Sequence, residues 1–181
     1  MKKLLLILFL IPLACDAQTN LNNNTVHINN WGDLTYELPH CVGSADSISY
    51  TVTLPSASVY RKINSGLISW HENDSIVGVG DSVHILLAGD YKVHMWISVT
   101  TSNQNDILRI RTFINNIMPP ISYGRFTIAS RGAGIAQSMY FMGYFGLAAN
   151  TWLSWHIENI TGARDATISD LKIYVEKVPE K

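Results

Sequence analysis

The sequence predicts an all-β fold of about eight to ten short antiparallel strands, arranged as a β-sandwich or a barrel. Two observations predict this fold class. Apolar and polar residues alternate with period two through most of the chain after residue 45, and clusters of Gly, Pro, Asn and Asp separate the alternating runs. In addition, no segment combines the 3.6-residue period of a helix with capping residues.

The alternation is clearest in residues 91–99. Every odd-numbered residue from Tyr91 to Val99 is apolar, whereas His94 and Trp96 lie on the opposite face of the expected strand. The other segments show shorter runs of the same kind. The expected strands are residues 31–38, 47–54, 67–70, 83–87, 91–99, 107–114, 125–129, 139–146, 152–159 and 168–178.

The N-terminus has the residue order of a cleavable secretory signal peptide. Lys2 and Lys3 precede an apolar run from Leu4 to Leu13, and small residues lead to Ala17. The run is shorter than the about 20 apolar residues that span a bilayer, and we expect no transmembrane span elsewhere. The expected organisation is a signal peptide over residues 1–17, a polar flexible lead-in over 18–30, and one β-sandwich domain over 31–178.

The two cysteines bear on the mature form. Cleavage after Ala17 would make Gln18 the first residue, but residues 11–15 also resemble the lipobox of bacterial lipoproteins, apart from Pro12. The alternative is therefore lipidation of Cys15, which would anchor the exported protein to a membrane. After cleavage at Ala17, Cys41 has no partner for an intramolecular disulfide, and we expect it to be a buried apolar residue.

Composition narrows the class of partner. The formal net charge is −1, so no strong field of either sign attracts nucleic acid or an anionic membrane. Charged residues make up only 15% of the chain, which is low for a soluble monomer. We therefore expect a surface with much neutral or apolar area and a protein that forms homo-oligomers.

Four motifs resemble the jelly-roll domain shared by tumour necrosis factor and the complement globular head. A strand enters a Gly-x-Tyr turn and a long alternating strand in DSVHILLAGDYKVHMWISV, residues 81–99, with Gly89 and Tyr91 at the motif positions. LRIRTFINN, residues 108–116, is similar to the family's strand that ends in an Asn-containing turn. FGLAANTWLSWHIEN, residues 145–159, has Ala-Asn in place of the usual Gly-Asp, and ISDLKIYVEKV, residues 168–178, is similar to the last strand.

The resemblance covers roughly residues 45–178 and implies an antiparallel jelly-roll β-sandwich of two sheets. Members of this family usually form trimers and bind other molecules through loops and outer faces. Mapped onto the family, residues 91–99 and 152–159 are expected to be neighbouring strands of the sheet through which the trimers pack. A self-association or ligand face is then expected to contain His94, Trp96, Trp152, His156 and Tyr174, together with Lys172.

This face admits three interpretations. The first is a half-apolar interface between copies of the chain, with aromatic side chains as anchors. A second is an aromatic face on a monomer that stacks against a sugar ring. The third is a metal ion on a threefold axis, although the six histidines show no His-x-His or His-x-x-x-His pair at ligand spacing. We expect no metal site and no cofactor.

Catalytic motifs are missing from the sequence. There is no Gly-x-Ser-x-Gly, the Gly-rich residues 130–134 lack the Lys and Ser/Thr of a phosphate loop, and the carboxylates are scattered. The sequence Asn159-Ile160-Thr161 matches a glycosylation sequon, but the leader looks bacterial or phage-borne, where such matches mean little. We therefore expect a protein that is not an enzyme.

The sequence as a whole predicts a non-catalytic, exported binding or structural module that forms trimers, either secreted, on a bacterial cell surface or phage-borne. Its partners would be other copies of itself and a protein or glycan ligand. The alternative is a monomeric carbohydrate-binding β-sandwich with an aromatic platform. The sequence does not name the ligand.

Overall fold

A computed structural model describes residues 19–21, 24–28, 34–37, 39–45, 48–66, 68–72, 75–119, 125–131 and 135–179. The expected signal peptide and Cys15 lie outside these residues. The chain divides into two compact units, Met1–Glu37 and Leu38–Lys181. Each unit has its own sheet pairing and is described by itself.

The first unit contains a three-stranded antiparallel sheet in the order β1-β2-β3. Its strands are β1 (Thr19–Leu21), β2 (Asn24–Ile28) and β3 (Leu34–Glu37). The sequence placed the start of the domain at residue 31, whereas β3 pairs with β2 and the second compact unit begins at Leu38. The described residues 19–21, 24–28 and 34–37 therefore form one small sheet.

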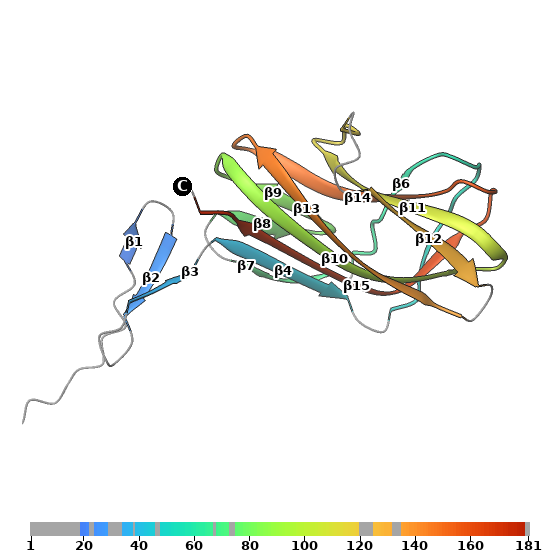
Figure 1. Ribbon diagram of the computed structural model, residues 1–181, viewed down its shortest axis with the longest axis horizontal. Coiled ribbons are helices and arrows are strands. Elements are labelled where there is room, and N and C mark those ends of the chain that lie inside the picture. Colours follow the sequence, from blue (N-terminus) through green and yellow to red (C-terminus); the bar gives the residue numbers. More distant parts are fainter. Residues whose placement is uncertain are drawn as a thin grey trace, which may run out of the picture. The chain divides into compact units, whose positions relative to one another are not determined.

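The second unit consists of twelve strands in the residues described, and Figure 1 shows their course. They are β4 (His40–Ala45), β5 (Tyr50–Val52), β6 (Arg61–Lys62), β7 (Ser69–Glu72), β8 (Ile76–Val79), β9 (Ser82–Ile85), β10 (Gly89–Thr101), β11 (Gln104–Ile114), β12 (Arg125–Arg131), β13 (Gln137–Leu147), β14 (Thr151–Asn159) and β15 (Ala166–Lys177).

These strands form two antiparallel six-stranded sheets. The β10 sheet has the order β13-β10-β15-β4-β7, with β5 beside β15, and the β14 sheet has the order β12-β11-β14-β9-β8, with β6 beside β14. From β9 to β15 the chain changes sheet at every connection except β11 to β12. Together with β4, these are eight strands arranged in two sheets of four, which is a jelly roll. The predicted fold class is therefore confirmed. The short strands β5 to β8 are additions to this framework.

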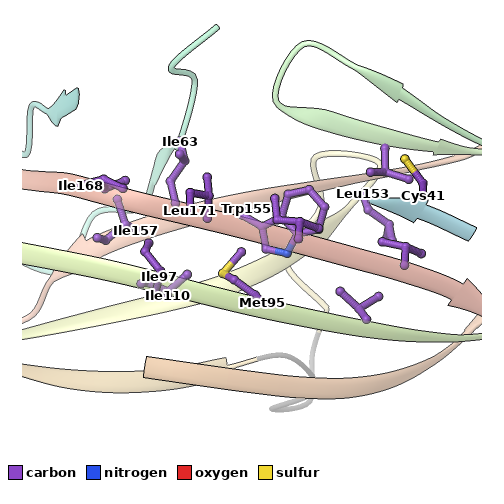
Figure 2. Close-up of a cluster of buried hydrophobic side chains, with 14 of the residues drawn as sticks. Cys41, Ile63, Met95, Ile97, Ile110, Leu153, Trp155, Ile157, Ile168 and Leu171 are labelled. Atoms are coloured by element: carbon purple, nitrogen blue, oxygen red, sulfur yellow. The ribbon is translucent and has the colours of Figure 1, made fainter. Parts of the chain in front are cut away.

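The core fills the space between the two sheets. Figure 2 shows Met95 from β10, Ile110 from β11 and Trp155 from β14 among the buried side chains. Trp155 is 1% exposed and is one of the largest side chains of the core. Cys41 is fully buried, as expected for an apolar residue of the core. The odd-numbered residues of 91–99 are all buried, so the predicted alternation of this strand is correct.

The Gly-x-Tyr motif has a structural cause. Gly89 has a φ of 151°, and a Cβ there would lie 2.6 Å from Cε of Lys177, so a side chain would meet both strain and a steric clash. Tyr91 is fully buried and its hydroxyl donates a hydrogen bond of 2.8 Å to the carbonyl oxygen of Leu87. This bond fixes the turn that leads from the β14 sheet to the β10 sheet.

The Ala-Asn departure from the family motif also has a local explanation. Asn150 adopts a φ of 59°, a left-handed conformation that Asn tolerates better than most residues. The Thr151 hydroxyl closes the turn by donating a 2.7 Å hydrogen bond to the carbonyl oxygen of Ala148. Asn150 therefore supplies the positive φ needed before β14 begins.

An ion pair at one end of the sandwich joins strand β11 to the loop after β14. The Asp106 carboxylate is 1% exposed and accepts hydrogen bonds from Nε and Nη2 of Arg164. Asn159 is fully buried, and its side-chain oxygen accepts hydrogen bonds from the Thr161 hydroxyl and from the backbone N–H groups of Thr161 and Gly162. The sequon residue Asn159 thus organises the loop after β14.

We predict that Asp106→Asn destabilises the domain by about 2 kcal/mol, because a charge-assisted pair in a buried setting is lost. Hydrogen bonds from Arg164 lower the pKa of Asp106 to about 2, from its ordinary 3.8. The stability that this carboxylate contributes is therefore present above pH 3.8 and is lost as the pH falls through about 2. Urea unfolding at neutral and acidic pH measures both effects. The exposed Asp90→Asn is the matched control, and equal losses in the two variants would contradict the prediction.

Candidate functional site

The outer surface of the β10 sheet gathers exposed aromatic and apolar side chains from two adjacent strands. In the β10–β13 register, Trp96 lies opposite Tyr140, His94 opposite Met142 and Lys92 opposite Tyr144. In the β10–β15 register, Trp96 lies opposite Lys172 and His94 opposite Tyr174. We call this surface the aromatic face; it comprises Lys92, His94, Trp96, Tyr140, Met142, Tyr144, Lys172, Tyr174 and Glu176.

The apolar members of the aromatic face are exposed to an unusual degree. The exposed fractions are 42% for Trp96, 48% for Tyr140, 45% for Met142 and 55% for Tyr144. These side chains are contiguous, since the rings of Trp96 and Tyr140 have centroids 4.8 Å apart. Soluble monomers seldom expose large apolar residues in one continuous patch. A patch of this kind is typical of surfaces at which proteins bind other molecules.

His94 lies within this patch and is held by polar and aromatic contacts. Its Nδ1 is 2.5 Å from the Tyr140 hydroxyl, and its ring stacks beside Trp96 at a centroid distance of 6.0 Å. Nε2 is 3.8 Å from Oε1 of Glu176, beyond hydrogen-bond distance. Burial lowers the pKa of His94, and the positive charge of Lys92 acts in the same direction. The imidazole is therefore neutral at neutral pH.

The charges at the margin of the aromatic face are largely balanced. Lys92 and Glu176 form an ion pair of 3.3 Å, and the Tyr174 hydroxyl donates a 3.0 Å hydrogen bond to Glu176. Lys172 is exposed next to Trp96, on the neighbouring strand. The face thus combines an apolar centre with a polar margin, which is the usual composition of a protein interface.

A shallow groove of about 440 Å³ crosses the same surface. Trp96 and Tyr140 line its apolar side, and Ser98, Ser138 and Lys172 contribute polar atoms. The hydroxyls of Ser98 and Ser138 are 2.7 Å apart and hydrogen-bond each other across β10 and β13. The groove offers a place for a protruding side chain or a small polar ligand.

The prediction that residues 91–99 and 152–159 are neighbouring strands is wrong. β10 pairs with β13 and β15, whereas β14 belongs to the opposite sheet and pairs with β11, β9 and β6. His94, Trp96 and Tyr174 therefore lie together on the aromatic face, and Trp152 and His156 lie on the outer surface of the other sheet. Strand β13 occupies the position that the sequence assigned to residues 152–159.

Trp152 and His156 have partners of their own on the β14 sheet. The Trp152 ring stacks on His84 with centroids 4.2 Å apart and an angle of 4° between the planes. The His156 ring stacks on Phe113 at 3.8 Å, and its Nε2 is 3.2 Å from the Ser154 hydroxyl. Burial lowers the pKa of His156 to about 4, with a further contribution from Lys62. These contacts account for both residues as parts of the outer surface of that sheet.

Trp70 is likewise explained by packing. Its indole N–H donates a 2.6 Å hydrogen bond to the carbonyl oxygen of Gly80. A Cβ at Gly43 in β4 or at Gly78 in β8 would overlap the indole ring, so both glycines make room for it. Trp70 therefore packs between β4 and β8, which belong to different sheets.

Sequence reasoning missed Tyr140, Met142 and Tyr144. The signal was present, because these residues alternate with Phe141 and Phe145 along a predicted strand. Period two alone does not say which of two apolar faces is buried. The structure answers this question, since Phe145 is 5% exposed and Tyr144 is 55% exposed.

The described residues also bear on metal binding and on membrane-spanning helices. No group of three or more His, Cys, Asp or Glu side chains there lies close enough to hold a metal ion. In the same part of the chain, no helix has the length and apolar character needed to cross a membrane.

No family model matches the sequence, and no curated protein matches it. Similar solved structures include PRD1 vertex protein P5, with a TM-score of 0.47, 11% identity and coverage of 78% of this chain and 98% of that chain. Murine APRIL has a TM-score of 0.47, 11% identity and coverage of 76% and 98%. Eiger TNF from S. frugiperda has a TM-score of 0.45, 14% identity and coverage of 79% and 96%. The jelly-roll assignment rests on the strand order of the two sheets.

We predict that His156→Phe makes the domain more resistant to mild acid. Because the pKa of folded His156 is about 4, below its ordinary 6.5, the unfolded chain binds the extra proton between these values. This histidine therefore lowers the stability as the pH falls from 6.5 towards 4, and phenylalanine removes that loss while keeping the stack on Phe113. Unfolding midpoints across this range test the prediction, with His71→Phe as an exposed control. A pH dependence unchanged from the wild type would contradict it.

Proposed function

We propose that this chain is an exported, non-catalytic module that assembles into a homotrimer through the aromatic face. The observation that carries the proposal is the continuous exposed patch of Trp96, Tyr140, Met142 and Tyr144 on one sheet. A protein with such a surface gains free energy when a second copy covers it, because apolar area leaves water. The large aromatic side chains and the polar margin suit an interface between proteins.

Strand β13 supplies a second argument. It is eleven residues long, contains no charged residue, and pairs only with β10 among the described strands. Natural proteins protect long edge strands with charges, proline or bulges, because a free edge promotes aggregation. β13 has no charge or proline, so its edge needs a cover in the functional protein.

The positions of the aromatic face and of the free edge of β13 support a trimer. The free edge of β13 and the aromatic face are adjacent but different surfaces. A contact between unlike surfaces of successive copies forms a ring where the rotation between copies closes, whereas a twofold contact pairs the same surface with itself. A ring of three also agrees with the family that the sequence motifs resemble.

The low charge of the chain favours the same assembly. Charged residues are only 15% of the sequence, and Lys92 and Glu176 on the aromatic face already neutralise each other. Lys172 adds one unbalanced positive charge, so the face repels a second copy only weakly. Assembly by burial of aromatic side chains needs no cofactor and no catalytic group.

We predict that the protein has three times the mass of one chain by light scattering, and that Trp96→Ser together with Tyr140→Ser converts it to monomers. The two substitutions remove the largest exposed rings of the interface, and truncation of such anchors typically costs at least about 2 kcal/mol of association free energy. Circular dichroism measures whether the variant keeps its β structure.

Trp152→Ser is the matched control, because this tryptophan has a similar exposure of 38% but lies on the other sheet. We expect it to leave the trimer intact. A wild-type protein that stays monomeric at micromolar concentration would contradict the proposed function. So would a trimer that the Trp152 variant disrupts and the Trp96–Tyr140 variant does not.

A second function is favoured by the groove beside Trp96. Its polar residues and aromatic wall are suited to a carbohydrate ring, which stacks on aromatic faces and hydrogen-bonds at its rim. This alternative predicts a monomer whose glycan binding is lost in the same Trp96–Tyr140 variant. Glycan-array binding of a monomeric wild-type protein would favour it over self-association.

Export rests on the leader and has its own test. We predict that the mature protein, recovered after expression in a bacterial host, begins at Gln18. Mass spectrometry of the N-terminal peptide measures this directly. A lipid-modified Cys15 as the first residue would replace the free secreted form by a membrane-anchored one, and an intact Met1 would contradict export.

A further inference from the structure

We propose that His94 makes self-association dependent on pH, so that the assembly forms near neutral pH and dissociates in mild acid. This inference rests on the proposed function and adds a regulation to it. His94 is suited to the role because it lies inside the aromatic face, surrounded by the rings that the interface would bury. Histidine is also the side chain whose charge ordinarily changes between about pH 5 and pH 8.

The contacts of His94 identify Nδ1 as the atom at which protonation would change the hydrogen bonding of the aromatic face. The Tyr140 hydroxyl and Nδ1 are 2.5 Å apart. In the neutral tautomer that carries its proton on Nε2, Nδ1 accepts the hydrogen bond that Tyr140 donates. Protonation turns Nδ1 into a donor, and the Tyr140 hydroxyl must then accept from it. The hydroxyl proton of Tyr140 then needs another acceptor, and on an exposed face water is that acceptor. Covering the face removes this water.

The charged and titratable groups around His94 come from four strands. β10 contributes Lys92, β13 contributes Tyr140 and Tyr144, β15 contributes Lys172, Tyr174 and Glu176, and His40 of β4 contacts the Tyr174 ring at 6.0 Å. Glu176 is the only carboxylate among these, and its Oε1 is 3.3 Å from Lys92 but 3.8 Å from His94. The nearby carboxylate is thus already engaged by lysine.

Burial decides the sign of the effect. In the free chain the pKa of His94 is already below its ordinary 6.5, mainly because of partial burial and also because of Lys92. A second copy that covers the aromatic face removes more water from the ring, which lowers the pKa further. Protons therefore bind more tightly to the separated chains than to the assembly. Association is strongest above the pKa of the free chain and weakens as the pH falls below it.

The test is sedimentation velocity of the purified protein at about pH 7.5 and about pH 5.5, for wild type, His94→Gln and two control variants. Glutamine keeps a polar side chain of similar length but takes up no proton. We expect the wild-type dissociation constant to rise severalfold at the lower pH, by at most about tenfold per site, since each pH unit below the pKa of the free chain corresponds to a factor of ten. His94→Gln should keep a nearly constant dissociation constant.

The controls separate His94 from other histidines. His40→Gln changes a histidine near the margin of the same face, and His84→Gln changes one on the other sheet. Both should retain the wild-type response to pH. A response that persists in His94→Gln, or a wild-type assembly equally strong at both pH values, would overturn the inference while leaving the proposed function intact. A protein that is monomeric at both pH values overturns the proposed function and the inference together.

Discussion

The structure depends on the two-sided character of strand β10. One side of this strand supplies Tyr91, Val93, Met95, Ile97 and Val99 to the core, all of them at most 1% exposed. Its other side presents His94 and Trp96 outward, between β13 and β15. Because side chains alternate strictly along a strand, burying one set fixes the direction of the other. The core and the aromatic face are therefore two consequences of a single strand register.

The neighbours of β10 enlarge the outer set into a surface. β13 adds exposed rings at Tyr140 and Tyr144, and β15 adds a polar margin that includes Lys172 and Glu176. The turn at Gly89 and the hydrogen bond of the Tyr91 hydroxyl hold the start of β10, while the Asp106–Arg164 pair joins β11 to the loop after β14. These contacts hold the strands in register, so the surface belongs to a rigid sheet and not to a loop. Rigid presentation reduces the entropy lost when such a surface is covered.

Much of the fold was predictable from local patterns. Period two identified the long strands and the buried side of residues 91–99. β4 was missed because its sequence HCVGSA has small residues where a strand usually shows large apolar ones, although Cys41, Gly43 and Ala45 are buried. β8 was missed because its pattern is short and contains Gly78, which the ring of Trp70 requires.

The candidate site was predicted only in part, and the reason is topological. Alternation tells which residues of one strand share a face, but it does not tell which strands are hydrogen-bonded neighbours. In a jelly roll the chain passes between two sheets, so Trp152 and His156 resemble Trp96 and His94 in pattern and still lie on the opposite sheet. The rings that complete the aromatic face come from β13, whose two sides are both rich in aromatic residues, and only the three-dimensional arrangement distinguishes them.

In the proposed trimer, other copies of the chain cover the aromatic face. Hydroxyl-radical footprinting, read by mass spectrometry at high and at low protein concentration, tests it most directly. If the trimer forms through the aromatic face, Tyr140, Met142 and Tyr144 are protected at high protein concentration and become reactive on dilution. Trp152 then reacts equally at both concentrations. Equal reactivity of the three β13 residues at every concentration would contradict it.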